Sequence, residues 1–140
     1  MAEALFRKMV EDAGADISVG SAGVGAFDGM GPSQHSLAVM KEENIDISHL
    51  RSAQISREMV SECSHIFGMT SGHCEAVKAH FPEAVEKTFV LREFIADEAL
   101  DFDVPDPIGG EIDDYRLARN LIQEALPSIF RFVTSGNPDA

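Results

Sequence analysis

Apolar and polar residues recur along the chain with two different periods, and the changes of period predict its elements. Residues 1–13 place apolar side chains at helical spacing, and Gly14 is suited to the position just past the end of that helix. Residues 17–21 alternate apolar and polar side chains, which is typical of a strand, and a glycine-rich loop follows over residues 22–29. The first segment therefore predicts a helix, a strand and a loop.

The middle of the chain alternates between helical and strand patterns. The spacing predicts helices over residues 33–43 and 56–60, a strand over residues 65–69 and a third helix over residues 70–80. Ser33, Ser56 and Thr70 stand where a side-chain oxygen can cap a helix N-terminus. Asn44 is suited to a left-handed backbone conformation at the end of its helix.

The last third of the chain adds one strand, over residues 87–91, and one long helix that begins at Ile112 and reaches about Phe132. Pro127 should kink or end this helix, and residues 135–140 read as a flexible tail. Strands that alternate with helices imply right-handed βαβ units and a parallel sheet covered on both faces. We therefore expect a single α/β domain over residues 1–140.

Composition narrows the classes of partner. The 140 residues, 44% of them apolar, suit one globular domain, and no apolar run is long enough to cross a bilayer. The net charge of -13 argues against nucleic acid and anionic membranes as partners. Two cysteines are too few for a disulfide framework and the first residues mix charged with apolar side chains, so we expect no signal peptide and a cytoplasmic location.

The segment with the clearest chemical meaning is the loop over residues 104–110, Val-Pro-Asp-Pro-Ile-Gly-Gly. Pro105 and Pro107 each fix their own φ and favour an extended conformation in the residue before them. Asp106 therefore lies on a stiff stalk that could hold a carboxyl group over a pocket, where it could protonate a leaving group. The alternative is that Asp-Pro and Gly-Gly simply make a turn.

Five segments, in order, resemble segments of the low-molecular-weight protein tyrosine phosphatase family: residues 1–6, 19–23, 44–52, 65–70 and 106–110. The resemblance runs from Met1 to about Phe132 and implies that family's α/β fold. It also implies a phosphate-binding loop, Cys-x5-Arg-Ser or Thr, just before Met1. That loop would supply the nucleophilic thiolate, and its arginine would stabilise the phosphate oxygens.

Neither cysteine of the chain can supply that loop. The residue six positions after Cys63 is Met69, and the residue six positions after Cys74 is His80. We therefore expect a truncated member of the family that lacks its first, central strand and is inactive as given. The two strands on either side of the missing one would stand about 9–10 Å apart. Low stability, closure of the gap, a borrowed strand or homodimerisation are the expected consequences.

The resemblance assigns roles to residues of this sequence. Asp106 matches the general acid, Ser21 and His49 match residues that brace the phosphate loop, and Phe27 and Ile108 match positions that wall the substrate cleft. Taken without the resemblance, each has an ordinary alternative: a strand-end hydroxyl for Ser21, a hydrogen-bonded surface histidine for His49, and a core side chain for Phe27.

The family's members are phosphotyrosine phosphatases, phosphoarginine phosphatases and arsenate reductases. Ile108, where an aromatic residue is common in tyrosine-specific members, weakens the case for phosphotyrosine. With the loop restored, we expect a phosphorylated protein or a small phosphomonoester as substrate. Without it, a catalytically dead binding module is the alternative, and arsenate reduction lacks the thiol relay that it needs.

We expect neither a metal nor a cofactor. The histidines and cysteines that could suggest zinc follow no strong ligand pattern in the chain: Cys63, His65, His73, Cys74 and His80. The two cysteines are more simply interpreted as structural thiols.

Overall fold

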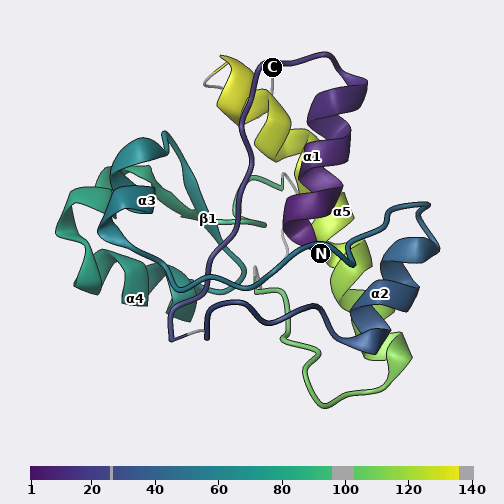
Figure 1. Ribbon diagram of the computed structural model, residues 1–140. Coiled ribbons are helices and arrows are strands. Elements are labelled where there is room, and N and C mark those ends of the chain that lie inside the picture. The colour runs from purple at the N-terminus through teal and green to yellow at the C-terminus, as the bar shows by residue number, and fades with distance from the viewer. Residues whose placement is uncertain (26, 96–102, 136–140) are drawn as a thin grey trace. The chain divides into compact units, whose positions relative to one another are not determined.

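The computed structural model describes residues 1–25, 27–95 and 103–135 (Figure 1). These residues divide into two units. Unit 1 comprises Met1–Gln54 and Asp106–Gln123, and unit 2 comprises Ile55–Pro105 and Glu124–Ala140. Unit 1 holds α1 (Ala2–Asp12), α2 (Gln34–Lys41) and the first half of α5 (Ile112–Ser135). Unit 2 holds the other half of α5 and the remaining elements: α3 (Arg57–Glu62), β1 (Ile66–Gly68), α4 (Ser71–His80), the 3₁₀ helix η1 (Pro82–Lys87) and β2 (Thr88–Val90).

Helix boundaries in unit 1 follow the capping residues. Gly14, just past α1, has a φ of 64°. Ser33 caps α2, because its hydroxyl oxygen accepts a hydrogen bond from the backbone N–H of Ser36 at 3.2 Å. Asn44 has a φ of 59° after the end of α2. These positions confirm the two predicted N-terminal helices and their end signals.

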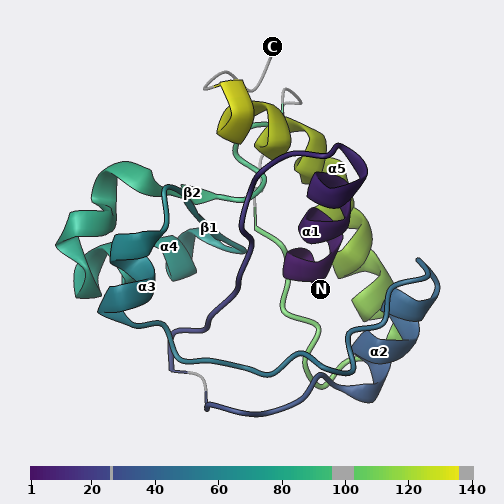
Figure 2. The same cartoon turned by 45° about the horizontal axis from the view of Figure 1, so that its top comes forward.

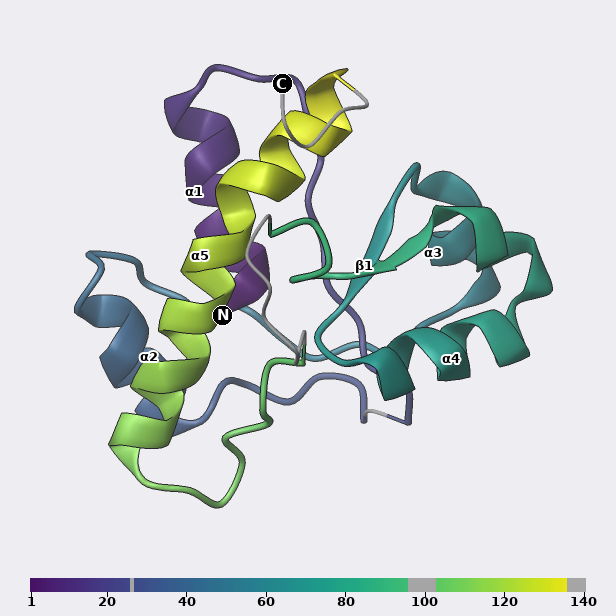
Figure 3. The same ribbon diagram turned by 180° about the vertical axis from the view of Figure 1, so that it is seen from behind.

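The core of unit 1 includes the face between α2 and the N-terminal half of α5, which lie side by side in Figure 3. Val39 and Met40 of α2 are fully buried, and the ring of His35 lies 5.3 Å from that of Tyr115. Arg119 donates a hydrogen bond to the carbonyl oxygen of Val39 at 3.2 Å. Both apolar burial and a side-chain bond to the helix backbone therefore join the two helices.

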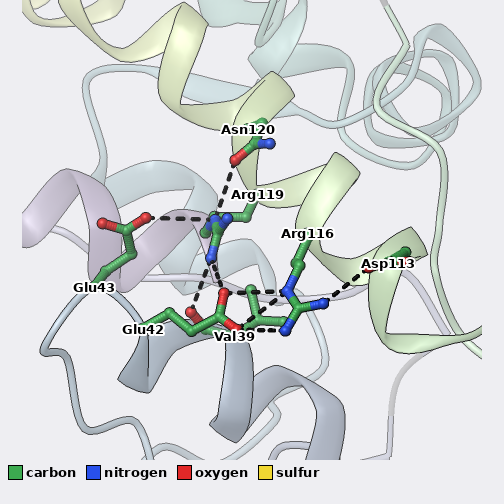
Figure 4. Close-up of polar contacts among 7 residues, drawn as sticks. All are labelled: Val39, Glu42, Glu43, Asp113, Arg116, Arg119 and Asn120. Atoms are coloured by element: carbon green, nitrogen blue, oxygen red, sulfur yellow. Dashed lines mark hydrogen bonds and ion pairs between the residues drawn. The ribbon is translucent and has the colours of Figure 1, made fainter.

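A cluster of ion pairs joins the end of α2 to α5 (Figure 4). Arg116 donates to Glu42 at 2.7 Å and to Asp113 at 2.8 Å, and Arg119 donates to Glu42 at 2.6 Å. Hydrogen bonds from Arg116 and then Arg119 lower the pKa of Glu42 to about 2 from its ordinary value of 4.5. Glu42 is therefore the carboxylate on which the cluster converges.

The low pKa of Glu42 predicts an acid-sensitive contribution to stability. A carboxylate whose pKa is depressed on folding stabilises the protein above its unfolded pKa, and this contribution disappears as pH falls from about 4.5 towards 2. We expect Glu42→Gln to flatten that part of the stability curve, measured by urea unfolding at a series of pH values. Because Glu42 and Arg116 are solvent-exposed, salt should weaken the effect. Glu58→Gln, an exposed acid on α3, is the matched control; equal flattening in both variants would contradict the assignment.

The strand expected over residues 17–21 is absent, so this prediction was wrong. The only pairing that the described structure assigns near it is an isolated bridge between Gly23 and Gln54. The carbonyl oxygen of Val19 instead accepts a hydrogen bond from the guanidinium of Arg7. Alternating side chains make a strand only when a neighbouring strand supplies a ladder of hydrogen bonds, and none of the described residues does so here.

Unit 2 contains the predicted βαβ unit, and Figure 2 shows α4 beside the two strands. β1 and β2 pair in parallel, with Phe67 opposite Phe89. Thr70 caps α4 by accepting from the N–H of His73 at 3.1 Å, as its position predicted. β1 was expected to be buried but is only half-buried along its length, because β2 is the one strand that pairs with it among the described residues.

The two faces of this strand pair are covered differently. On one face, α4 approaches so closely that a Cβ at Gly68 would lie 2.6 Å from the sulfur of Cys74. On the other face, aromatic rings gather, with Phe94 stacked on Phe132 of α5 at 4.4 Å and Phe89 edge-on to Phe132 at 5.0 Å. The close helix and the aromatic cluster together hold the short parallel sheet.

Pro127 does not end the last helix, because α5 continues through it to Ser135. An interior proline removes one backbone hydrogen bond of the helix and destabilises it by about 3 kcal/mol. Leu126 and Ile129 on either side of Pro127 are both buried. Burial of a large apolar side chain stabilises the fold by about 1.5–3 kcal/mol, so these two residues offset the cost of the proline. The short helix η1 was not predicted. Of the tail expected over residues 135–140, Ser135 is instead the last residue of α5, and residues 136–140 lie outside the described residues. Within the described ranges no helix is long and apolar enough to span a membrane.

Candidate functional site

The Asp106 loop is folded so that its carboxyl group is both held and exposed. Oδ1 of Asp106 accepts a hydrogen bond from the backbone N–H of Ile108 at 3.0 Å. The N–H of Gly110 donates to the carbonyl oxygen of Pro107 at 2.8 Å, and Gly109 has a φ of 80°, which together form a type II turn. Asp106 is solvent-exposed. The loop is therefore a turn, as its composition indicated, and that turn fixes the direction of one exposed carboxyl.

The same loop is joined to the first turn of α5. Asp114 accepts a hydrogen bond from the backbone N–H of Glu111 at 2.8 Å, which is half of a capping box. A Cβ at Gly110 would lie 2.5 Å from Oδ2 of Asp114, so any larger residue there would have to displace the carboxylate from this cap. Sequence reasoning missed this bond, for which the acidic residues in the first turn of α5 were the available signal.

Ser21 is bound to α1 through two residues that sequence reasoning missed. Its hydroxyl donates to Oε1 of Glu3, and Oε2 of Glu3 pairs with Arg7 at 2.6 Å. Burial opposes ionisation of Glu3, but the hydrogen bonds from Ser21 and Arg7 outweigh it and lower its pKa. The proton of Ser21 is thus committed to Glu3, and its oxygen can accept a further bond. The i, i+4 spacing of Glu3 and Arg7 was the available signal.

His49 lines a hollow of about 350 Å³ between α1 and residues 44–50. Arg7, Lys8 and Glu11 line the α1 side of this hollow. On the other side, Asp46 accepts a hydrogen bond from the backbone N–H of Ser48 at 2.9 Å, and bonds from Ser48 lower the pKa of Asp46. His49 is an exposed residue on a well-formed turn beside α1.

Phe27 and Ile108 are both strongly exposed, at 78% and 80% of their surface. The core alternative for Phe27 is therefore wrong. Its loop is held by backbone bonds from the segment around Ser52, whose N–H donates to the carbonyl oxygen of Met30 at 2.7 Å and whose carbonyl oxygen accepts from Gly29 at 2.8 Å. Both side chains are thus accessible, and their role as walls of a substrate cleft stays a prediction.

All five candidate residues lie in unit 1, but they contact different neighbours. Ser21 bonds to α1, Asp106 bonds within its own turn, and His49 lines the hollow beside α1. In the part of the chain that the structure describes, no assigned hydrogen bond joins Asp106 to Ser21 or His49. The local setting of each residue is thus defined, and its catalytic role stays a prediction.

The two cysteines are held as thiols inside unit 2. Cys74 donates to the carbonyl oxygen of Phe89 at 3.2 Å, and burial raises the pKa of its thiol. Cys63 donates to the carbonyl oxygen of Val60 at 3.4 Å. No group of three metal-binding side chains occurs within residues 1–25, 27–95 and 103–135. The Cys74 thiol is thus held in its neutral form by burial.

Comparisons with known proteins agree on one family. The family model described as low molecular weight phosphotyrosine protein phosphatase matches residues 1–136. A protein-arginine-phosphatase of Geobacillus stearothermophilus is 41% identical over 107 residues, which cover 76% of this chain and 70% of that protein. A second protein-arginine-phosphatase, of Bacillus subtilis, is 32% identical over 126 residues, covering 90% and 82% of the two chains.

Solved structures confirm the expected α/β fold with a parallel sheet and flanking helices. A crystal structure of a YwlE mutant from Bacillus subtilis has a TM-score of 0.85 and 29% identity, covering 96% of this chain and 88% of that one. The YwlE arginine phosphatase from Geobacillus stearothermophilus has a TM-score of 0.78 and 36% identity, covering 96% and 86%. With the match of its sequence over residues 1–136, the chain belongs to the low molecular weight phosphotyrosine protein phosphatase family.

Proposed function

We propose that this chain carries the general-acid half of a protein phosphatase site whose nucleophilic half is a Cys-x5-Arg loop preceding Met1. The observation that carries the proposal is the exposed carboxyl of Asp106, held by the N–H of Ile108 between two prolines. This hydrogen bond orients the carboxyl, and no ion pair of Asp106 is found among the described residues. An oriented carboxyl without an ion-pair partner is suited to proton transfer to a bound ligand.

The proposed reaction has two steps. In the first, the cysteine thiolate of the loop attacks phosphorus, the bond to the leaving group breaks, and Asp106 donates its proton to the leaving atom. In the second, water attacks the phosphocysteine, and the Asp106 carboxylate accepts the proton of that water. Inorganic phosphate and the free thiolate are released, so the site returns to its starting state.

Phosphoarginine on proteins is the substrate that we favour. Two relatives, 41% and 32% identical to this chain over 70% and 82% of their own length, are called protein-arginine-phosphatases. Ile108, exposed on the turn after Asp106, offers an aliphatic wall rather than an aromatic ring that could stack on phosphotyrosine. Phosphotyrosine is the second candidate, because the family description names it. A reducing compartment such as the cytoplasm suits a nucleophilic thiolate.

The experiment compares the 140-residue chain with the same chain extended upstream by the open reading frame. We expect the 140 residues alone to hydrolyse neither p-nitrophenyl phosphate nor a phosphoarginine peptide, because neither cysteine begins a Cys-x5-Arg loop. The upstream frame should encode an apolar strand and that loop, and the extended protein should hydrolyse both compounds. Release of inorganic phosphate is the measurement.

Three outcomes would contradict parts of this proposal. Hydrolysis by the 140-residue chain that is lost in Asp106→Ala would show that the loop is not needed. A folded, loop-bearing protein that releases no phosphate would reject the phosphatase assignment. A closed upstream frame, with one partner co-purifying at fixed stoichiometry, would favour the catalytically dead binding module instead.

A further inference from the structure

The segment that leads into the Asp106 loop is tied to the junction between β1 and α4. Oδ1 of Asp103 accepts a hydrogen bond from the backbone N–H of Ser71 at 2.7 Å. The next residue, Val104, is buried and donates its backbone N–H to the carbonyl oxygen of Met69 at 2.8 Å. Two successive residues are therefore anchored just before Pro105.

The bond from Ser71 is a strong one for physical reasons. Ser71 is the first residue of α4, and its N–H is one of the groups that a helix leaves without an internal partner. Thr70 already accepts from the N–H of His73, so Asp103 satisfies a different donor from outside the helix. A carboxylate is also favoured at a helix N-terminus by the helix dipole and by the charge assistance of the bond.

The backbone between Asp103 and Asp106 transmits this anchoring. Only Val104 and Pro105 separate the two acids, and Pro105 and Pro107 fix their own φ angles on either side of Asp106. Asp106 has a short, stiff connection to the anchor before it, and the Ile108 N–H bond limits its side chain after it. A change at Asp103 therefore has only two residues, one of them a proline, in which to be absorbed before it reaches Asp106.

We propose that Asp103 is a positioning residue for Asp106, which rests on the proposed function of Asp106 as general acid. Asp103 touches no substrate in this proposal. It holds the residues just before the loop through Ser71, and so restricts the backbone from which the Asp106 carboxyl projects. A displacement of about 1 Å at a reacting group can cost about a hundredfold in rate, so such an anchor matters for catalysis.

The first test uses the 140-residue chain and needs no catalytic activity. The ¹H–¹⁵N shift of the Ile108 amide reports the Asp106 bond, and Asp106→Ala calibrates the shift of its loss. We expect Asp103→Ala to shift the Ser71 amide signal, because its acceptor is lost. It should also shift the Ile108 signal in the same direction as Asp106→Ala does. Asp103→Asn keeps an acceptor oxygen and should restore the Ile108 signal towards its original position. Glu75→Ala, an exposed acid on α4, is the matched control and should leave Ile108 unmoved.

The second test uses the loop-bearing protein and separates positioning from folding. Asp103→Ala should lower kcat for phenyl phosphate by about tenfold, with KM little changed and a smaller loss for p-nitrophenyl phosphate. The p-nitrophenolate leaving group is more stable than phenolate, so its departure depends less on a general acid. Asp103→Asn should recover most of the activity. A purely structural role would lower kcat for both compounds equally.

An Ile108 signal that stays in place while Ser71 moves would overturn the proposal, because Asp103 would then cap α4 and nothing more. Equal losses on both phosphate esters would overturn it too. If the loop-bearing protein releases no phosphate, the proposed function fails, and the Ile108 amide alone decides whether Asp103 positions the loop.

Discussion

Asp106→Ala is expected to lower kcat of the loop-bearing protein by about 10²–10³-fold, within the usual contribution of a general acid. The physical reason is that the leaving group must depart as an anion when no proton is supplied. The loss should be largest for phenyl phosphate and a phosphoarginine peptide, and smaller for p-nitrophenyl phosphate, whose leaving group is already stable. Substrate binding should change little, since the carboxyl acts on the leaving atom in the transition state.

Two variants make this result interpretable. Glu111→Gln alters an exposed acid in the same segment and should leave the rate unchanged. Asp106→Asn keeps an oxygen that can accept from the Ile108 N–H but has no proton of suitable acidity to donate, so it should be as slow as the alanine variant. A rate in Asp106→Asn close to that of the unmodified protein would show that the loop geometry, and not proton transfer, is what Asp106 supplies.

Local signals in the sequence predicted the structure well wherever one residue acts on its own neighbours. Ser33, Ser56 and Thr70 each cap the helix that follows, because a side-chain oxygen needs only the next few N–H groups. The left-handed Asn44 and Gly14 are equally local. The Asp106 turn belongs to this class, since its bonds close within residues 106–110.

The β1–β2 pairing was predicted from the sequence, but other long-range contacts were not. Residues 17–21 carry a strand pattern but form no strand, since pairing depends on a neighbour that the alternation itself cannot specify. The contacts of Glu42 with Arg116 and Arg119 join residues more than seventy positions apart. Asp103 could not be recognised either, because its partner Ser71 is 32 residues away and nothing in the loop points to it.

Gly68→Ala is expected to destabilise the protein by about 2 kcal/mol, although alanine is better than glycine in most strands. The added Cβ would lie 2.6 Å from the sulfur of Cys74 and 3.4 Å from its backbone nitrogen. Cys74 is buried and its sulfur donates to the carbonyl oxygen of Phe89, so it has little room to move aside. Either α4 must separate from β1 or the strand must bend, and both lose packing. Urea unfolding measures the change.

A double-mutant cycle tests this cause directly. With Cys74→Ala present, the closest atom is gone and the remaining neighbours of the new Cβ lie at 3.4 Å, so Gly68→Ala should then be nearly neutral. The coupling between the two changes should thus approach the full 2 kcal/mol, about the size of the single effect. Gly72→Ala, on α4, is the control, because its Cβ would meet nothing closer than 3.7 Å and helix propensity favours alanine by up to about 1 kcal/mol. If Gly68→Ala is as harmful with Cys74→Ala as without it, the close approach of α4 to β1 is not what requires glycine there.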